Sequence, residues 1–165
     1  MSIVAWIRTL QVAPPSDHGD TETVVRIVKE LDKLEPERAR FLAAFAYVLS
    51  RVAGADNRVS EAETAAMVNL VEKKGRLQRA QAVLVVEIAK NQNKLFGSTE
   101  DFLVTREFRS IATDEERRDL LHCLFVISAV EAGVSPEESA QMRQIASELG
   151  FSHEDFIRTR LALRL

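Results

Sequence analysis

Cysteine, glycine and proline are scarce in this sequence. Its 165 residues include one Cys, six Gly, four Pro, one Trp and one Tyr. A single cysteine excludes an intrachain disulfide and any zinc site built from several cysteines. So few turn formers, with only one Trp and one Tyr, argue against a turn-rich β-sandwich or barrel.

Long apolar runs are also missing. No stretch approaches the roughly 20 apolar residues of a membrane span. The apolar N-terminus is interrupted by Arg8, too early for the core of a signal peptide. We therefore expect the protein in the cytoplasm, where an unpaired cysteine such as Cys123 stays reduced.

Neither sign of charge dominates. The chain carries 22 Lys and Arg against 25 Asp and Glu, a formal net charge of -3. Such a balance gives no general attraction to nucleic acid. Apolar residues make up 46% and charged residues 28% of the chain, which is a globular composition.

Helical periodicity runs through most of the chain. The spacing of apolar residues predicts helices over 24–34, 36–54, 60–74 and 77–92, and capping residues start others at Ser98, Thr113, Ser135 and Ser152. No strand is predicted. The expected fold is all-α, a compact bundle of seven or eight helices.

The first twenty residues are set apart from this bundle. Residues 1–12 have an amphipathic helical pattern, and 14–20 hold two prolines and several turn formers, typical of a linker. We expect an arm and linker over 1–20 and one helical domain over 21–165. The arm either folds back on its own domain or makes a weak contact with a membrane surface or partner.

Three capping boxes support the predicted helix starts. Each has a hydroxyl followed three residues later by Glu, and they begin at Ser60, Thr113 and Ser135. The hydroxyl accepts from a free backbone N–H, and the Glu carboxylate accepts from the backbone of the cap residue.

The chain nearly repeats itself at an offset of 75 residues. The segment 55–63 aligns with 130–138, Met67 aligns with Met142, and Gly75 aligns with Gly150. Each copy, roughly 41–75 and 116–150, reads as an apolar helix, a short acidic loop, a capped helix and a glycine stop. We expect two pseudo-symmetric helical hairpins that bury their apolar faces against each other.

These repeated segments resemble the TerB-like (tellurite-resistance) family. The resemblance rests on 41–63, on its partner run 130–138 and on 145–150, and it covers about residues 24 to 160. The loop usual in the family reads Ala-Asp-Gly, any residue, an aliphatic residue, Ser or Thr, then Glu three residues later. Here Asn57 replaces the loop glycine in the first copy, and Glu131 and Ala132 stand where Asp and Gly are usual in the second.

The resemblance implies a non-enzymatic module associated with resistance to tellurite and other chemical stress. It also implies divalent metal binding through the acidic loops and work with membrane-associated proteins, at the periphery of the inner membrane. The carboxylates that would hold the metal are Asp56, Glu63, Glu131 and Glu138. Carboxylate oxygens suit hard cations such as Ca²⁺, Mg²⁺ or Mn²⁺.

The same four residues have a purely structural explanation. Glu63 and Glu138 are the acidic members of two capping boxes, and Asp56 and Glu131 can accept from nearby loop N–H groups. The alternative function is therefore a metal-free helical scaffold that docks a protein or membrane-associated partner.

The remaining polar residues assemble no catalytic set. The sequence has no glycine-rich phosphate loop, no nucleophile elbow and no His-Glu-x-x-His motif. Adjacent His122 and Cys123 point about 100° apart on a helix, so they do not share a metal easily. Arg158, Arg160 and Arg164 form either a solvated helix face or a small basic patch for an acidic partner or anionic lipid.

Overall fold

A computed structural model describes residues 3–13, 21–53, 61–130 and 136–163. Its elements in chain order are α1 (Ile3–Leu10), β1 (Gln11–Ala13), α2 (Thr21–Asp32), α3 (Pro36–Ala53), α4 (Glu61–Gly75), α5 (Arg79–Lys90), α6 (Gln92–Phe96), β2 (Ser98–Thr99), α7 (Asp101–Ile111), α8 (Asp114–Val130), α9 (Pro136–Glu148) and α10 (His153–Ala162). The prediction of an all-α fold is confirmed.

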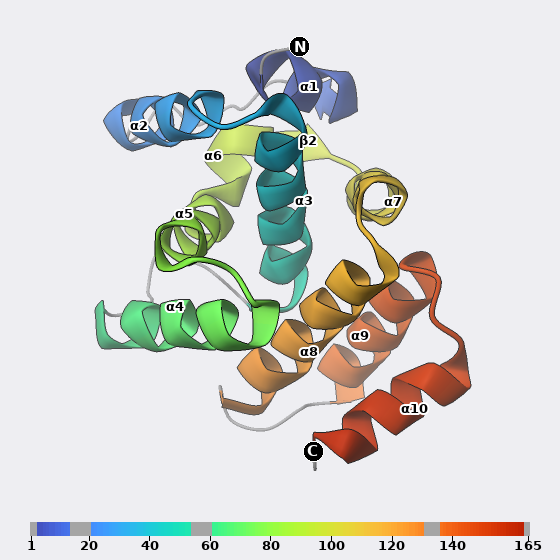
Figure 1. The fold of residues 1–165 in the computed structure, drawn as a ribbon. Coiled ribbons are helices and arrows are strands. Elements are labelled where there is room, and N and C mark those ends of the chain that lie inside the picture. The colour runs from blue at the N-terminus through green and yellow to red at the C-terminus, as the bar shows by residue number, and fades with distance from the viewer. Residues whose placement is uncertain (1–2, 14–20, 54–60, 131–135, 164–165) are drawn as a thin grey trace.

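Helix α3 is the central element of the bundle (Figure 1). Its residues 41–49 are all buried, on every side of the helix. A helix that is apolar all round needs neighbours all round, and α3 packs against α5, α7, α8 and α9. Phe41 and Phe45 of α3 form one aromatic cluster with Phe108, in which the ring centroids lie no more than 6.0 Å apart in tilted or edge-to-face pairs.

Helix α4 packs along α5 and α8 on one side of this centre. The β-branched run 83–86 lies in α5, as its polar flanks predicted. No helix among the described residues is long and apolar enough to cross a bilayer.

The N-terminal arm folds back onto the helical body, one of the two alternatives predicted for it. Helix α1 packs against α2, α3 and α6, and β1 pairs antiparallel with β2. This pairing corrects the prediction that the chain has no strand. Three and two residues are too short for an alternating pattern to stand out in the sequence. The domain boundary at residue 20 stays a prediction.

The start of α7 also differs from the prediction. Ser98 belongs to β2, and α7 begins at Asp101 after Glu100, which makes no side-chain cap. The short helix α6 was not predicted, because the helix predicted over 77–92 ends where α6 begins and residues 91–94 are all polar, so no apolar periodicity marks a further helix. Both differences fall in 91–100, where the chain turns from α5 towards α7.

Two predicted caps are present in full. Thr113 N donates to Glu116 Oε1 at 2.9 Å, and Glu116 N donates to Thr113 Oγ1 at 3.1 Å, which is a complete capping box. Ser152 Oγ accepts from Asp155 N at 3.1 Å at the start of α10. The boxes that begin at Ser60 and Ser135 lie outside the described residues, so these two stay predictions.

The two aligned glycines, Gly75 and Gly150, have different roles at the ends of α4 and α9. After α9, Gly150 has φ of 95°, and the bond from Phe151 N to Ala146 O completes a Schellman motif. After α4 the left-handed residue is Arg76, with φ of 54°, and not Gly75 as the repeat predicted. A Cβ at Gly75 would lie 3.3 Å from the Phe45 ring, so this glycine serves close packing. The pseudo-symmetry of the two hairpins stays a prediction.

Candidate functional site

The predicted metal ligands fall at the edges of what the structure describes. Asp56 and Glu131 lie outside the described residues. Glu63 lies in the first turn of α4, and Glu138 lies, half-buried, in the first turn of α9. Over the described ranges no three His, Cys, Asp or Glu side chains form a group that can hold a metal. The four-carboxylate set therefore stays a prediction.

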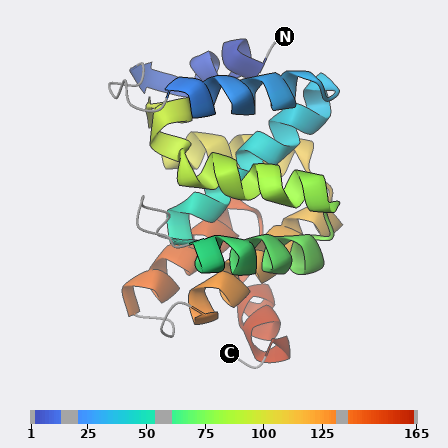
Figure 2. The ribbon, with the colours of Figure 1, turned by 90° about the vertical axis from the view of Figure 1, so that its left-hand side faces the viewer.

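The helix ends next to these residues lie on one side of the molecule. Figure 2 shows the C-terminal ends of α3 and α8 and the N-terminal ends of α4 and α9 at the same edge of the bundle. Helices α4 and α8 also pack directly against each other. The described flanks of the two acidic segments are thus brought to a common side, although their carboxylates are far apart in sequence.

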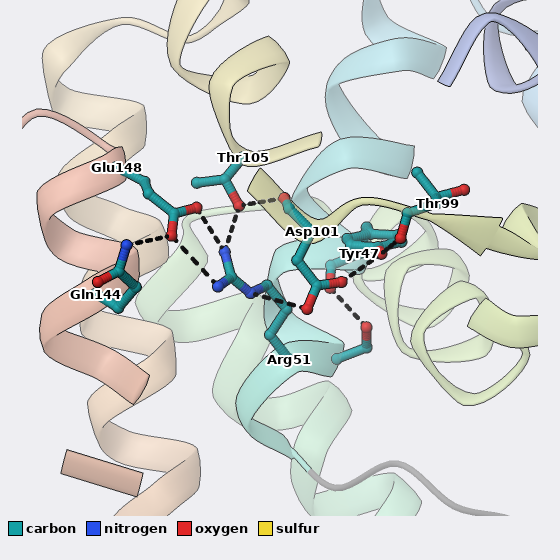
Figure 3. A network of polar contacts seen from close by, with 8 residues as sticks. Tyr47, Arg51, Thr99, Asp101, Thr105, Gln144 and Glu148 are labelled. Atoms are coloured by element: carbon teal, nitrogen blue, oxygen red, sulfur yellow. Dashed lines mark hydrogen bonds and ion pairs between the residues drawn. The ribbon is translucent and has the colours of Figure 1, made fainter. Parts of the chain in front are cut away.

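A polar network with a buried ion pair at its centre holds the end of α3 in place (Figure 3). Arg51 lies in the last turn of α3 and pairs with Glu148 in the last turn of α9, with Nη1–Oε1 at 2.8 Å and Nη2–Oε2 at 3.4 Å. Each of these side chains is only 6% exposed. Arg51 Nη1 also donates to Thr105 Oγ1 at 2.7 Å, on α7.

Asp101 connects this pair to Tyr47. The Asp101 carboxylate lies 3.7 Å from Arg51 Nε and accepts from the Tyr47 hydroxyl at 2.5 Å. Tyr47 lies one turn before Arg51 on α3, and its hydroxyl shares its single proton with Thr99 O in β2, at the longer distance of 3.2 Å. Burial, and then the Asp101 carboxylate, raise the pKa of the Tyr47 hydroxyl, which therefore stays protonated as a donor.

The network joins three helix ends with complementary charge. Arg51 adds a cation to the C-terminal end of α3, and Asp101 adds an anion to the N-terminal end of α7, so both oppose the helix dipoles. Glu148 is an anion at a C-terminal end, the unfavourable place, and Arg51 compensates it. Gln144 Nε2 donates to Glu148 Oε2 at 3.1 Å and fixes the carboxylate from its own helix.

This network was not predicted from the sequence. The feature that could have revealed it is Arg51 itself, a charge four residues after Tyr47 inside the apolar run of α3. A charge in such a run requires a buried partner. The partner, Glu148, is 97 residues away, and nothing in the sequence pairs the two.

The only cysteine of the chain is a core residue. Cys123 is fully buried, and burial raises the pKa of its thiol to about 12. A thiol with this pKa holds almost no nucleophilic thiolate at neutral pH. Neighbouring His122 is half-buried at the edge of the same core, and burial lowers its pKa.

The other polar candidates are dispersed. His18 and Arg164 lie outside the described residues. His153 opens α10 and its ring stacks 6.3 Å from Phe156. On the same helix Arg158 pairs with Asp155 at 3.3 Å, and Arg160 is half-buried.

The described residues thus define a mainly helical module around α3, with a buried ion pair next to the first acidic segment. A family model described as Tellurite resistance protein TerB matches residues 41–161. The chain belongs to the TerB family, and the resemblance seen in the sequence is confirmed. No curated protein and no solved structure gives a significant match.

Proposed function

We propose that this protein is a non-enzymatic stress-response module that binds a divalent cation through its two acidic segments. The ligands are Asp56 and Glu63 from the first segment, with Glu131 and Glu138 from the second. The stress is tellurite or a related chemical insult, the class after which the family is named. The protein acts by interaction with a partner and not by catalysis.

The arrangement of helix ends carries the proposal. The ends of α3, α4, α8 and α9 that border the acidic segments lie on one side of the bundle (Figure 2). The Arg51–Glu148 pair fixes the end of α3 against α9, so the first segment starts from a rigid point. A rigid frame reduces the entropy that a loop loses when it binds a ligand.

The donor set fits a hard cation. It consists of carboxylates alone, and carboxylate oxygens bind Ca²⁺, Mg²⁺ and Mn²⁺ in preference to softer metals. The only thiol of the chain, Cys123, is buried in the core away from solvent. A bound cation would neutralise the clustered carboxylates and change how these helix ends contact a partner.

A thermal-melt series tests this proposal. After chelator treatment, Ca²⁺, Mg²⁺ or Mn²⁺ is titrated into the wild type and into the double variant Asp56→Asn, Glu63→Gln. The amides keep an oxygen that can cap a helix but lose the charge. A ligand at 100 times its Kd adds about 2.7 kcal/mol of stability, so we expect a saturable rise in Tm that the variant lacks.

The matched control removes two other carboxylates from the same helix starts. Glu61→Gln with Glu137→Gln changes exposed residues of α4 and α9 that the proposal does not use. This control should keep the full metal response. An equal rise in all three proteins, or no rise at millimolar metal, would show that Asp56 and Glu63 only stabilise helix starts.

A metal-free scaffold is the second candidate, and an exposed stripe on α10 favours it. Ile157 and Leu161 are one turn apart and 37% and 68% exposed, with Arg158 between them. Apolar and basic side chains together suit an acidic amphipathic partner. Absence of any metal response, with binding to such a partner lost in Leu161→Asp, would favour this function.

A further inference from the structure

Helix α1 lies on the body of the protein as a ligand helix lies in a groove. Its residues Ile3, Trp6, Ile7 and Leu10 follow the spacing i, i+3, i+4, i+7, and none is more than 8% exposed. This spacing is the anchor pattern of an amphipathic helix bound in an apolar groove. Here α2, α3 and α6 provide the groove, while Arg8 and Thr9 face solvent.

Four buried apolar side chains attach the arm to the bundle. Polar ties to the rest of the molecule include Ile3 N to Asp32 Oδ1, a long bond of 3.4 Å, and the short pairing of β1 with β2. An eight-residue helix is not stable alone in water, so release of the arm also unfolds it. The gain from four buried side chains and the cost of ordering the arm are of similar size. The arm can therefore open without unfolding of the bundle.

The arm also lies outside the family unit. The TerB match begins at residue 41, so it includes α6 and most of α3 but not α1. The surface that α1 covers is thus formed in part by residues that match the family, while α1 itself lies outside the matched residues.

We propose that this groove also accepts the arm of a second copy, so that the chain forms an arm-exchanged dimer. The occupant is identical, so every apolar contact of α1 and the β1–β2 pairing can be made again in trans. Exchange of an identical element is a low-cost route to a dimer. The proposal is independent of the proposed cation site.

Charge argues against a membrane as the destination of the released arm. The arm has one basic residue, Arg8, and the sequence that follows it holds Asp17, Asp20 and Glu22. An anionic bilayer would repel these carboxylates. Binding to the groove of a second copy does not bring these carboxylates to an anionic surface.

The single tryptophan of the chain allows binding to the groove to be measured by fluorescence. Variant Trp6→Ala, Ile7→Asp empties the groove and leaves the chain without tryptophan. A peptide of residues 1–13 is then added, and its Trp6 is the only tryptophan in the sample. We expect a saturable blue shift of its emission maximum. The same peptide with Ile3→Asp and Ile7→Asp should show none.

The matched control is the full chain with Trp6→Phe, which lacks tryptophan but keeps a filled groove. A tethered arm competes at an effective concentration near the millimolar range, so this chain should bind the peptide at least about 10-fold more weakly. Far-UV circular dichroism verifies that both variants stay helical. Equal binding to both chains, or no shift with about 1 mM peptide, would overturn the groove as a binding site.

Sedimentation of the wild type over a concentration series tests exchange without any variant. We expect a monomer–dimer equilibrium that Ile7→Asp abolishes and Leu161→Asp, on exposed α10, leaves unchanged. A wild type that stays monomeric up to about 1 mM, the scale of the tethered competitor, would contradict the proposal. A dimer lost in Leu161→Asp and kept in Ile7→Asp would also contradict it, because the interface would then be α10.

Discussion

Arg51 shows how much depends on one buried charge. Its guanidinium is 6% exposed, and Glu148 neutralises it from another helix at 2.8 Å. Removal of one partner leaves the other charge buried without compensation, whereas replacement of both by apolar groups removes the desolvation cost as well. Loss of one member of the pair should therefore cost more stability than the intact pair contributes, and this cost keeps α3 and α9 together.

We expect Glu148→Gln to lower the free energy of unfolding by about 3–5 kcal/mol, because Arg51 loses its counter-ion in a buried place. Urea unfolding measures this loss. The double variant Arg51→Met, Glu148→Leu should recover most of it.

The control for this pair is an exposed ion pair of the same kind. Arg158→Met removes the Arg158–Asp155 pair, whose side chains are 75% and 47% exposed, and should cost less than about 1 kcal/mol. If Glu148→Gln cost no more than this control, the buried pair would not hold the two helices together.

His122 gives the protein a predicted pH dependence. Burial lowers its pKa, and Lys74, Arg118 and Arg76 act in the same direction against the opposing Asp119. The unfolded chain therefore takes up a proton first, near the ordinary pKa of about 6.5. The stabilising contribution is complete above that pH and is lost as pH falls towards the lower pKa of the folded state.

The measurement is the urea midpoint at pH 7.5 and 5.5. We expect the wild type to lose stability at the lower pH, and His122→Gln to lose less. His153→Gln, at an exposed position on α10, should behave as the wild type. A pH slope that His122→Gln leaves unchanged would assign the dependence to other groups.

At the scale of the element, the two helices that end near an aligned glycine, α4 and α9, terminate differently. Gly150 after α9 has φ of 95°, and a Cβ there would lie 2.9 Å from the Arg109 guanidinium. Gly75 is aligned with it in sequence but has a different task, because Arg76 takes the left-handed position after α4. The sequence repeat is therefore one residue out of step with the structural ends of these helices.

We expect Gly150→Ala to lower the free energy of unfolding by about 1–2 kcal/mol, since an L side chain is strained in the left-handed region. Chemical unfolding measures this, and Arg109 must also move aside. Ser147→Ala, at an exposed position of α9, should stay within about 0.5 kcal/mol of the wild type. Equal effects for the two variants would mean that the strain is absent.

The helices themselves could be predicted because their evidence is local. Pro36 begins α3, Thr113 caps α8 and Ser152 caps α10, as their neighbours in sequence indicated. The turn from α5 to α7 could not be predicted, because Ser98 is paired with β1, a segment more than 80 residues earlier. Long-range pairing overrides a local capping preference there.

At the scale of the whole molecule, part of the candidate site could be predicted from the sequence and part could not. The acidic residues Asp56 and Glu138 could be picked out by their repeat and by the family they resemble. The polar network could not be predicted, since Arg51, Asp101 and Glu148 come from three helices that only the fold brings together. The sequence thus identifies the acidic residues better than it identifies the packing of the helices next to them.

The attachment of the arm has a consequence for synthesis on the ribosome. Gln11 pairs with Thr99, which follows it by 99 − 11 = 88 residues. At about 5–20 residues per second, roughly 4–18 s pass between the two. For that time the apolar face of the arm, with Trp6, has left the ribosome while the far wall of its groove does not yet exist. Each nascent chain therefore offers a free arm to any finished copy nearby, and closely spaced ribosomes on one message would favour exchange between neighbours.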